Sequence, residues 1–140
     1  MKLLFNSGEH TNAKPIMLLL LRLSAGGFML YGHGLRKWDK LMGGGEISFA
    51  DPFGIGPQAT LGLVVFAEVL CAVLLILGLF TRWALIPLAF TMLVAAFYIK
   101  SGKPFGDREM ALLYLLLFAV SYVFGPGKYS LDAYLEKRKD

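Results

Sequence analysis

Residues 61–80, LGLVVFAEVLCAVLLILGLF, decide the fold because they form an apolar run that a single carboxylate, Glu68, interrupts. A helix rises about 1.5 Å per residue, so roughly 20 apolar residues cross the hydrocarbon core of a bilayer, which is about 30 Å thick. The run therefore predicts a membrane-spanning helix. Only Thr81 and Arg82 separate it from a second apolar run at 83–99, and so short a connection predicts a tight antiparallel hairpin.

Two further apolar runs flank this hairpin. The first, at 16–35, begins directly after Pro15, which suits the first turn of a helix because its missing N–H would be unpaired there. The other, at 110–124, is stopped by the Gly-Pro-Gly sequence at 125–127. We therefore expect four membrane-spanning helices, at about 16–35, 61–80, 83–99 and 110–124.

The segment after this stop has the pattern of a helix that lies on the membrane surface. Ser130 can cap the segment SLDAYLEKRK, in which Leu131, Tyr134 and Leu135 fall on one face at helical spacing. The chain is thus predicted to be all-α: an integral membrane four-helix bundle with a short C-terminal interfacial helix, forming one domain over residues 1–140.

Composition supports a membrane protein. The hydrophobic share of 56% exceeds the about 45–50% usual in water-soluble domains, and the apolar residues form blocks instead of alternating as in an outer-membrane barrel. No basic face interleaved with exposed aromatic residues is present, which argues against nucleic-acid binding. The stretch 1–15 is of mixed polarity, unlike a signal peptide, so we expect the first span to be retained.

The distribution of basic residues bears on membrane orientation. Leaving out Arg22, a model with the N-terminus inside places seven Lys and Arg residues in the cytoplasm and six outside. A margin of one residue does not decide the orientation, but the cluster EKRK at 136–139 favours a cytoplasmic location for both termini.

A few ionisable residues within or at the rims of the spans form the candidate site. Each charge at the bilayer centre costs about 2.5–3.5 kcal/mol on insertion scales, so pairing or function is expected. Arg22, His33 and Lys37 share one stripe of the first helix. In the antiparallel second helix, the depth of Glu68 falls between those of Arg22 and His33. With Glu109 at the entrance to the fourth span, these five residues are the predicted ligand-binding or proton-relay set.

The residues leave two main interpretations of this set open. In one, Arg22 and Glu68 form a buried ion pair that fixes how two helices dock, and His33 is a hydrogen-bonded residue at a helix end. In the other, these three line a small cavity that binds a polar head group or relays protons. A charged contact to a partner subunit is a further reading. A transporter for a small anion is a minor one, since no inverted repeat is apparent.

Other patterns indicate little chemistry. The segment GIGPQA (54–59) half-matches a dinucleotide-binding loop, but no strand precedes it and Pro57 intrudes, so we interpret it as a turn. His33 is the single histidine of the spans and His10 lies in the N-terminal tail, which is too few for bis-histidine haem. We predict no metal or haem.

Three blocks of this sequence, in their order and spacing, resemble the DoxX family. The first is RLSAGGFMLYGHGLRKW (22–38), which opens with Arg22 and ends in a His-Gly-x-x-Lys element, His33 to Lys37. The second, AEVLCAVLLILGLFTRWA (67–84), is similar to the family's Ala-Glu…Gly-Leu-x-Thr-Arg block. The third, GPGKYSLDAYL (125–135), is similar to its Gly-x-Gly-x-x-Ser-Leu-Asp ending.

The resemblance implies a four-helix protein of the bacterial inner membrane. Members of this family have been linked to thiosulfate:quinone oxidoreduction and to membrane complexes that handle thiols and oxidative stress. Cys71 is the only cysteine, so disulfide exchange within one chain is excluded, which favours contact with a quinone or with a partner's redox centre.

We therefore expect the membrane subunit of a redox complex in the lipid bilayer. A quinone is the candidate cofactor, and a redox partner subunit or a second copy of this chain is the candidate partner. The alternative is a non-catalytic scaffold or assembly helper with a structural Arg22–Glu68 pair. The sequence does not determine whether the chain is itself an enzyme.

Overall fold

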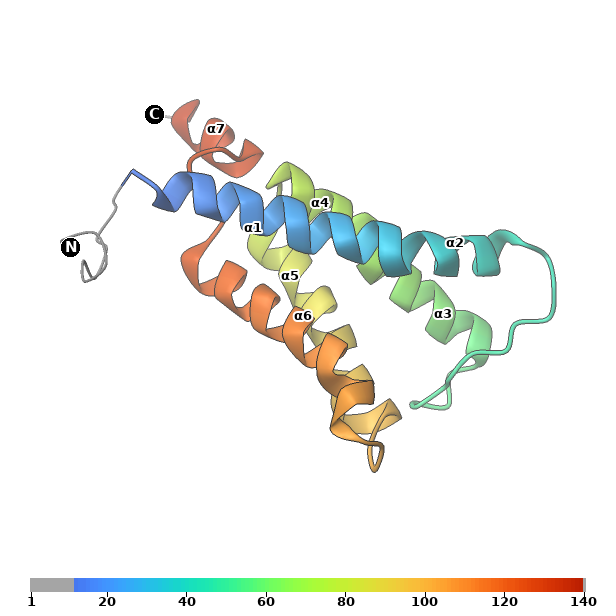
Figure 1. Ribbon diagram of the computed structural model, residues 1–140. Helices are drawn as coiled ribbons and strands as arrows, with labels where there is room; N and C mark the ends of the chain where they lie inside the picture. Colours follow the sequence, from blue (N-terminus) through green and yellow to red (C-terminus); the bar gives the residue numbers. More distant parts are fainter. Residues whose placement is uncertain (1–11, 140) are drawn as a thin grey trace.

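The computed structural model describes residues 12–139, and the regular secondary structure in this part of the chain is entirely helical (Figure 1). Residues 1–11 lie outside the described residues. They include His10 and most of the stretch 1–15, on which the expectation of a retained first span is based. Four long helical rods and one short helix follow in order.

Three of the rods change from α-helix to a π-helical segment along their length. The first consists of α1 (Lys14–Met29), the π-helical η1 (Leu30–Gly34) and α2 (Leu35–Met42). The second consists of α3 (Pro57–Val65), the π-helical η2 (Phe66–Cys71) and α4 (Ala72–Leu77). The third consists of α5 (Thr81–Val94) and the π-helical η3 (Ala95–Ile99). The fourth is α6 (Phe105–Phe124), and the short helix is α7 (Leu131–Lys137).

Three of these rods are long and apolar enough to cross a membrane, namely Lys14–Met42, Pro57–Leu77 and Thr81–Ile99. They confirm the all-helical, multi-pass membrane fold and the first three expected spans. α6 has 20 residues, but its first two turns carry Asp107, Arg108 and Glu109, and composition and length do not single it out as a span. A fourth span therefore stays a prediction.

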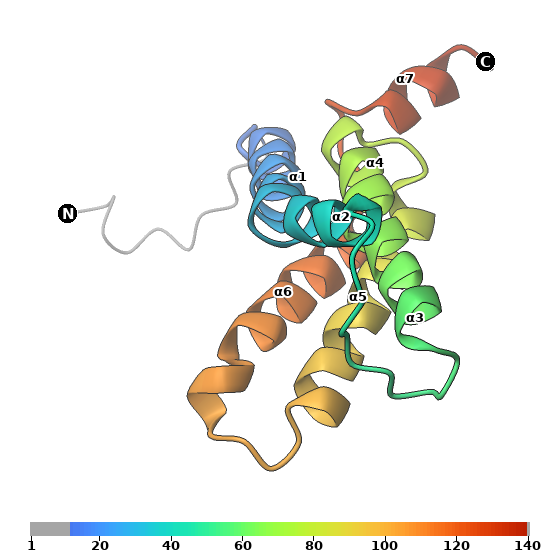
Figure 2. The same cartoon turned by 90° about the vertical axis from the view of Figure 1, so that its right-hand side faces the viewer.

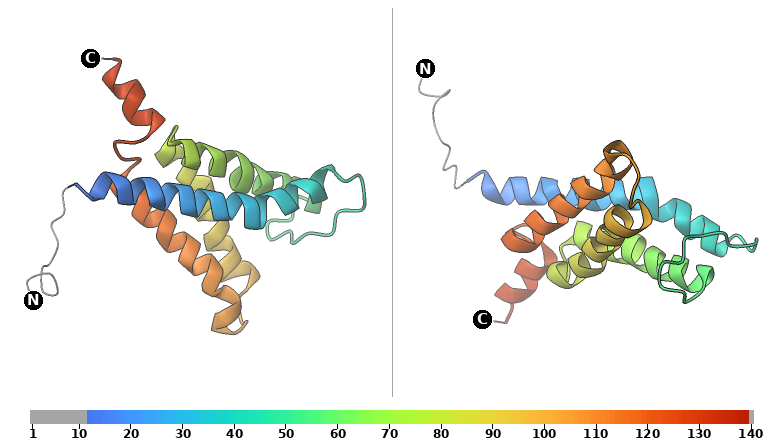
Figure 3. Two further views of the ribbon diagram at one scale, coloured as in Figure 1. Left: turned by 45° about the horizontal axis from the view of Figure 1, so that its top comes forward. Right: turned by 90° about the horizontal axis from the view of Figure 1, so that it is seen from below.

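The rods are close together at one end of the molecule and spread apart at the other (Figures 1 and 3). α1–α2 lies antiparallel to α3–α4, whereas α5 and α6 form a second pair that leans away from α2, as the end-on view shows (Figure 2). We call the end with the α4–α5 turn and α7 the closed end. The opposite end, with the loop 43–56 and the turn before α6, is the open end.

The core is apolar and draws on all four rods. Its buried side chains include Ala25, Met29, Leu75, Leu88 and Phe118. Large apolar side chains are also exposed along the outer faces of every rod. An exposed apolar surface of this extent is rare on water-soluble monomers and fits contact with lipid.

A hydrogen-bonded network around Asp132 ties the closed end together. Its carboxylate accepts bonds from the N–H groups of Phe80 (2.8 Å) and Thr81 (2.9 Å) and from the Thr81 hydroxyl (2.8 Å), which caps the start of α5. The Asp132 N–H in turn donates to the Gly78 carbonyl at 2.9 Å. The C-terminal segment is thereby fastened to the α4–α5 turn.

The helix expected after the Gly-Pro-Gly stop is confirmed. Ser130 is its N-cap, and the hydroxyl accepts a bond from the Ala133 N–H at 3.2 Å. Leu131, Tyr134 and Leu135 are all exposed. Their place along the membrane surface stays a prediction.

Arg22 belongs to the closed end, and the expected Arg22–Glu68 ion pair is wrong. The Arg22 side chain is 1% exposed, and its guanidinium donates to the carbonyl oxygens of Ile76, at 3.4 Å, and of Tyr129. Carbonyls at a helix C-terminus carry partial negative charge and so suit a buried cation. Gly78, with φ +69°, leaves room for it, since a Cβ there would lie 1.9 Å from Arg22 Nη1.

The error has a geometric reason. The first helix continues to Met42 and does not end near Leu35, so its last turns reach the level of Glu68. Lys37 and not Arg22 therefore meets the carboxylate. Arg22 lies 15 residues earlier, which is about 22 Å along a helix axis.

Candidate functional site

A cavity of about 480 Å³ lies between the two helix pairs, towards the open end. Its wall is mostly apolar and is built by all four rods and the loop 43–56. The polar part of the wall is formed by His33, Lys37, Glu68 and Tyr114, and Thr60, Thr91 and Lys100 also line the cavity. A volume of this size lies within the about 300–1,000 Å³ range of small-molecule sites.

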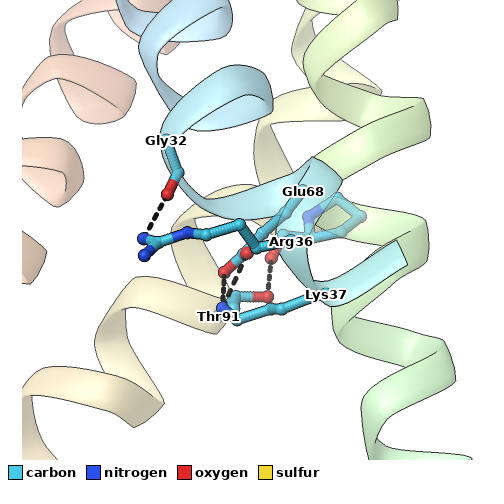
Figure 4. Close-up of polar contacts among 6 residues, drawn as sticks. Gly32, Arg36, Lys37, Glu68 and Thr91 are labelled. Carbon is cyan, nitrogen blue, oxygen red and sulfur yellow. Dashed lines mark hydrogen bonds and ion pairs between the residues drawn. The ribbon is translucent and has the colours of Figure 1, made fainter. Parts of the chain in front are cut away.

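An ion pair between Glu68 and Lys37 stands at the polar part of the cavity (Figure 4). Lys37 Nζ lies 2.7 Å from each carboxylate oxygen of Glu68. The Glu68 side chain is 0% exposed and that of Lys37 is 28% exposed, so the carboxylate is at the back of the site and the ammonium faces its opening. The isolated carboxylate of the second span is thus neutralised by a cation from the first helix.

Three helical irregularities surround the cavity. η1 supplies His33, η2 supplies Phe66, Ala67 and Glu68, and η3 supplies residues of the 95–99 segment to its wall. A π-helical turn holds one more residue than an α-helical turn and so changes which side chains face inward; such turns are frequent at functional sites. Their coincidence here singles out this cavity.

Gly34 explains how η1 and η2 approach each other. A Cβ on Gly34 would lie 2.4 Å from the carbonyl oxygen of Glu68, so the two backbones are in direct contact. Only glycine permits this approach. It places Lys37, one turn further along the first rod, opposite Glu68.

His33 and Tyr114 form a second polar pair beside the ion pair. Their rings meet edge to face, with centroids 5.6 Å apart, and Tyr114 also stacks on Phe118 with centroids 5.8 Å apart. An imidazole can donate and accept hydrogen bonds and a phenol can do the same. Both side chains line the cavity, so both are available to a polar ligand group.

The loop 43–56 covers the cavity with an aromatic side chain. The ring of Phe53 stacks on those of Phe90 and Tyr98, with centroid distances of 6.2 and 6.4 Å. Both Phe53 and Phe90 also line the cavity, so this stack forms part of its rim.

Asp51 holds this loop in shape. Its carboxylate accepts bonds from the N–H groups of Ile55 (3.1 Å) and Gly56 (2.8 Å) and from the Thr60 hydroxyl (2.9 Å). The turn expected over 54–59 is right for residues 54–56 and wrong for 57–59, which form the first turn of α3. Desolvation alone would raise the pKa of Asp51, but these hydrogen bonds, led by that from Gly56, hold the pKa below its usual value.

The structure brings together three of the five predicted site residues. His33, Lys37 and Glu68 line the cavity, whereas Arg22 is bound to carbonyls at the closed end. Glu109 is exposed and is not part of the cavity wall. A ligand role for Arg22 and Glu109 therefore finds no support in the geometry.

Sequence reasoning missed Tyr114 and Lys100. Tyr114 is a polar-tipped residue within an apolar run, and Lys100 directly follows the third span, so both could have been noticed. Within residues 12–139, no group of three His, Cys, Asp or Glu side chains is arranged to hold a metal ion. The side chains that line the cavity can donate and accept hydrogen bonds and can transfer protons.

Comparison with known proteins identifies the family. The DoxX family model matches residues 17–101, which cover most of the first rod and all of the second and third. This chain belongs to the DoxX family. The DoxX protein is also similar to an uncharacterized protein of Haemophilus influenzae, with 34% identity over 129 residues that cover 85% of this chain and 90% of the relative. No solved structure matches it.

The residues that carry the DoxX resemblance divide between two places. Gly78, Thr81 and Asp132 meet at the closed end, where they join the α4–α5 turn to the C-terminal segment. Lys37 and Glu68 meet at the cavity. One group of this DoxX protein therefore holds the fold together, and the other provides its candidate site.

Proposed function

We propose that this DoxX-family protein binds a small membrane-soluble ligand, such as a quinone, in the cavity beside Glu68, and that it is the membrane subunit of a redox complex in the bacterial inner membrane. The observation that carries the proposal is the cavity itself: a mostly apolar wall with a polar part formed by His33, Lys37, Glu68 and Tyr114. A quinone has an apolar ring that suits the apolar wall and carbonyl oxygens that suit the polar part.

The ion pair leaves a hydrogen-bond donor for such a ligand. An ammonium has three N–H groups, and the two carboxylate oxygens of Glu68 take two of the Lys37 donors. The third is available to an acceptor oxygen such as a quinone carbonyl. His33 and Tyr114, at the same part of the wall, can bind a second oxygen or pass a proton.

The redox partner, the inner-membrane location and the cytoplasmic termini rest on different grounds. They follow from the family resemblance and from the charge pattern of the sequence. The exposed apolar faces of the rods support a lipid environment, and a partner subunit or second copy would cover part of the same faces.

Quinone binding to the purified protein tests the ligand proposal. Titration with a short-chain ubiquinone in lipid nanodiscs, followed by tryptophan fluorescence and thermal shift, should give saturable binding. Glu68→Gln should weaken it about tenfold or more, because the amide frees Lys37 and disturbs the donor that faces the ligand. The matched control is Glu109→Gln, which removes a carboxylate outside the cavity and should change nothing. Absence of saturable binding by wild-type protein would overturn the proposal.

The second candidate function is a non-catalytic scaffold or assembly helper. It is favoured by the closed-end network and by the ion pair, each of which fixes how helices dock. A double variant, Lys37→Met with Glu68→Leu, separates the two functions because buried ion pairs are often replaceable as a unit. A scaffold would keep both fold and cellular function in this variant, whereas a ligand-binding protein would keep its fold and lose ligand binding.

A further inference from the structure

We infer that the ligand of this cavity is an acidic amphiphile, whose anionic head binds near Lys100, Lys37 and His33 while its apolar tail extends into the lipid between α3 and α5. The inference rests on the proposed function, since it uses the same cavity. It adds the charge of the ligand's head and the route of its tail.

The cavity has more positive than negative charge. Its lining contains two lysines and one histidine but, among the described residues, a single carboxylate, that of Glu68. Both oxygens of that carboxylate are bonded to Lys37, so the pair has no net charge. The charge in the lining that no carboxylate balances is therefore that of Lys100.

Lys100 lines the cavity without a carboxylate partner among the described residues. Its Nζ donates to the main-chain oxygen of Asp107 at 2.6 Å, and a peptide carbonyl has no net charge to cancel that of the ammonium. Within the described part of the chain, no carboxylate forms an ion pair with Lys100. Of its three N–H donors, two therefore remain for a ligand.

A positive charge beside apolar walls favours an anion over a neutral head group. In a partly buried setting the attraction between opposite charges is several times stronger than in bulk water. Lys37, with its third N–H, and His33, with a ring N–H, line the same cavity as Lys100. A head group that carries a carboxylate, phenolate or enolate oxygen suits these donors.

Part of the cavity wall is also exposed on the outer, apolar surface of the rods. Leu63 and Phe66 on the second rod and Phe90 on α5 line the cavity, and they are also 61%, 48% and 56% exposed. A side chain that both lines a cavity and lies at the outer surface marks an opening between them. This opening faces the hydrocarbon region, so an apolar tail can remain in the lipid while the head is bound.

A matched pair of ligands tests the inference. The probes are an alkyl 2-hydroxy-1,4-naphthoquinone, which is ionised at neutral pH, and its 2-methoxy ether with the same chain. Binding of each to nanodisc-embedded protein is measured by fluorescence titration. We expect the ionised compound to bind about tenfold or more tightly than the ether, as one added charge contact in a partly buried site allows.

Three lysine variants test whether Lys100 causes the preference for the ionised compound. Lys100→Gln keeps a hydrogen-bond donor but removes the charge, and it should abolish the preference for the ionised compound over the ether. Lys100→Arg should keep the preference. Lys103→Gln, three residues away and outside the cavity wall, is the control and should behave as wild type.

The outcomes separate this inference from the proposed function. If both compounds bind equally, the acidic head is overturned and the ligand-binding proposal stands. If neither binds, the proposed function falls and this inference falls with it. A preference that survives in a folded Lys100→Gln protein would overturn the assignment to Lys100.

Discussion

Replacing Gly34 by alanine should separate the two helices that form the ion pair, and replacing the nearby Gly32 should not. The added Cβ at Gly34 would lie 2.4 Å from the carbonyl oxygen of Glu68 and 2.9 Å from its carbonyl carbon, where ordinary contacts begin at 3.4 Å. Both opposing atoms are backbone, so relief requires η1 and η2 to move apart by about 1 Å. At Gly32 the same Cβ would meet nothing within 4 Å.

The expected magnitude follows from comparing the two variants. Both gain about 0.5–1 kcal/mol because alanine loses less backbone entropy than glycine in a helix, so that gain cancels between them. The remaining difference is the cost of overpacking, about 1–3 kcal/mol. Gly34→Ala should therefore unfold more easily than Gly32→Ala by that amount.

The free energy of unfolding can be measured by SDS titration in mixed micelles, with tryptophan fluorescence as the signal. Quinone affinity, measured on the same samples, should fall in Gly34→Ala only, because the shift moves Lys37 away from Glu68. Equal stability of the two variants would refute the direct backbone contact on which the site geometry depends.

Three further predictions concern the closed end and the loop. Asp132→Ala should lower the free energy of unfolding by about 1–3 kcal/mol, since it removes three hydrogen bonds and a helix cap, whereas exposed Asp39→Ala should change it little. Arg22→Met should cost about 1–3 kcal/mol, because it removes the hydrogen bonds that the buried guanidinium donates to the carbonyls of Ile76 and Tyr129. The exposed control Arg36→Met should cost less than about 1 kcal/mol, as is usual for a surface contact. The folded state lowers the pKa of Asp51 below the ordinary aspartate value of 3.8. The contribution of Asp51 to the stability of the loop is therefore complete above that ordinary value and is lost as pH falls through the lower pKa of the folded state. Limited proteolysis should thus show the loop 43–56 opening in acid, with Asp51→Asn cleaved readily at every pH; no change in cleavage between neutral and acidic pH would contradict this.

Local sequence patterns were sufficient for much of the fold. Three helices long and apolar enough to span a membrane and the helix capped by Ser130 are encoded by residues close to one another in the chain, so hydropathy and capping rules find them. The membership of His33, Lys37 and Glu68 in one site followed from the cost of charges in lipid.

Long-range contacts account for what the sequence did not reveal. Asp132 caps a helix that begins about 50 residues earlier, and no local pattern shows that partnership. One of the two interpretations paired Glu68 with Arg22, whereas the structure pairs it with Lys37, because the first helix continues to Met42 and its last turns lie at the level of Glu68. The π-helical segments leave no trace in composition at all.

The cavity lies between the two helix pairs and not within the first pair, formed by the rods α1–α2 and α3–α4. Glycines of the first rod keep these two rods close together along their length. Gly26 faces Ala72, where a Cβ would lie 3.0 Å from the carbonyl oxygen, and Gly34, about two turns later on the same face, touches Glu68 in the same way. Two such contacts leave no room for a ligand within that pair. At the open end, where α5 and α6 lean away from α2, space remains between the pairs, and side chains such as Phe90 and Tyr114 line it. The glycines that close one interface thus also carry Lys37 to Glu68, so the position of the ion pair and the position of the cavity have a common origin.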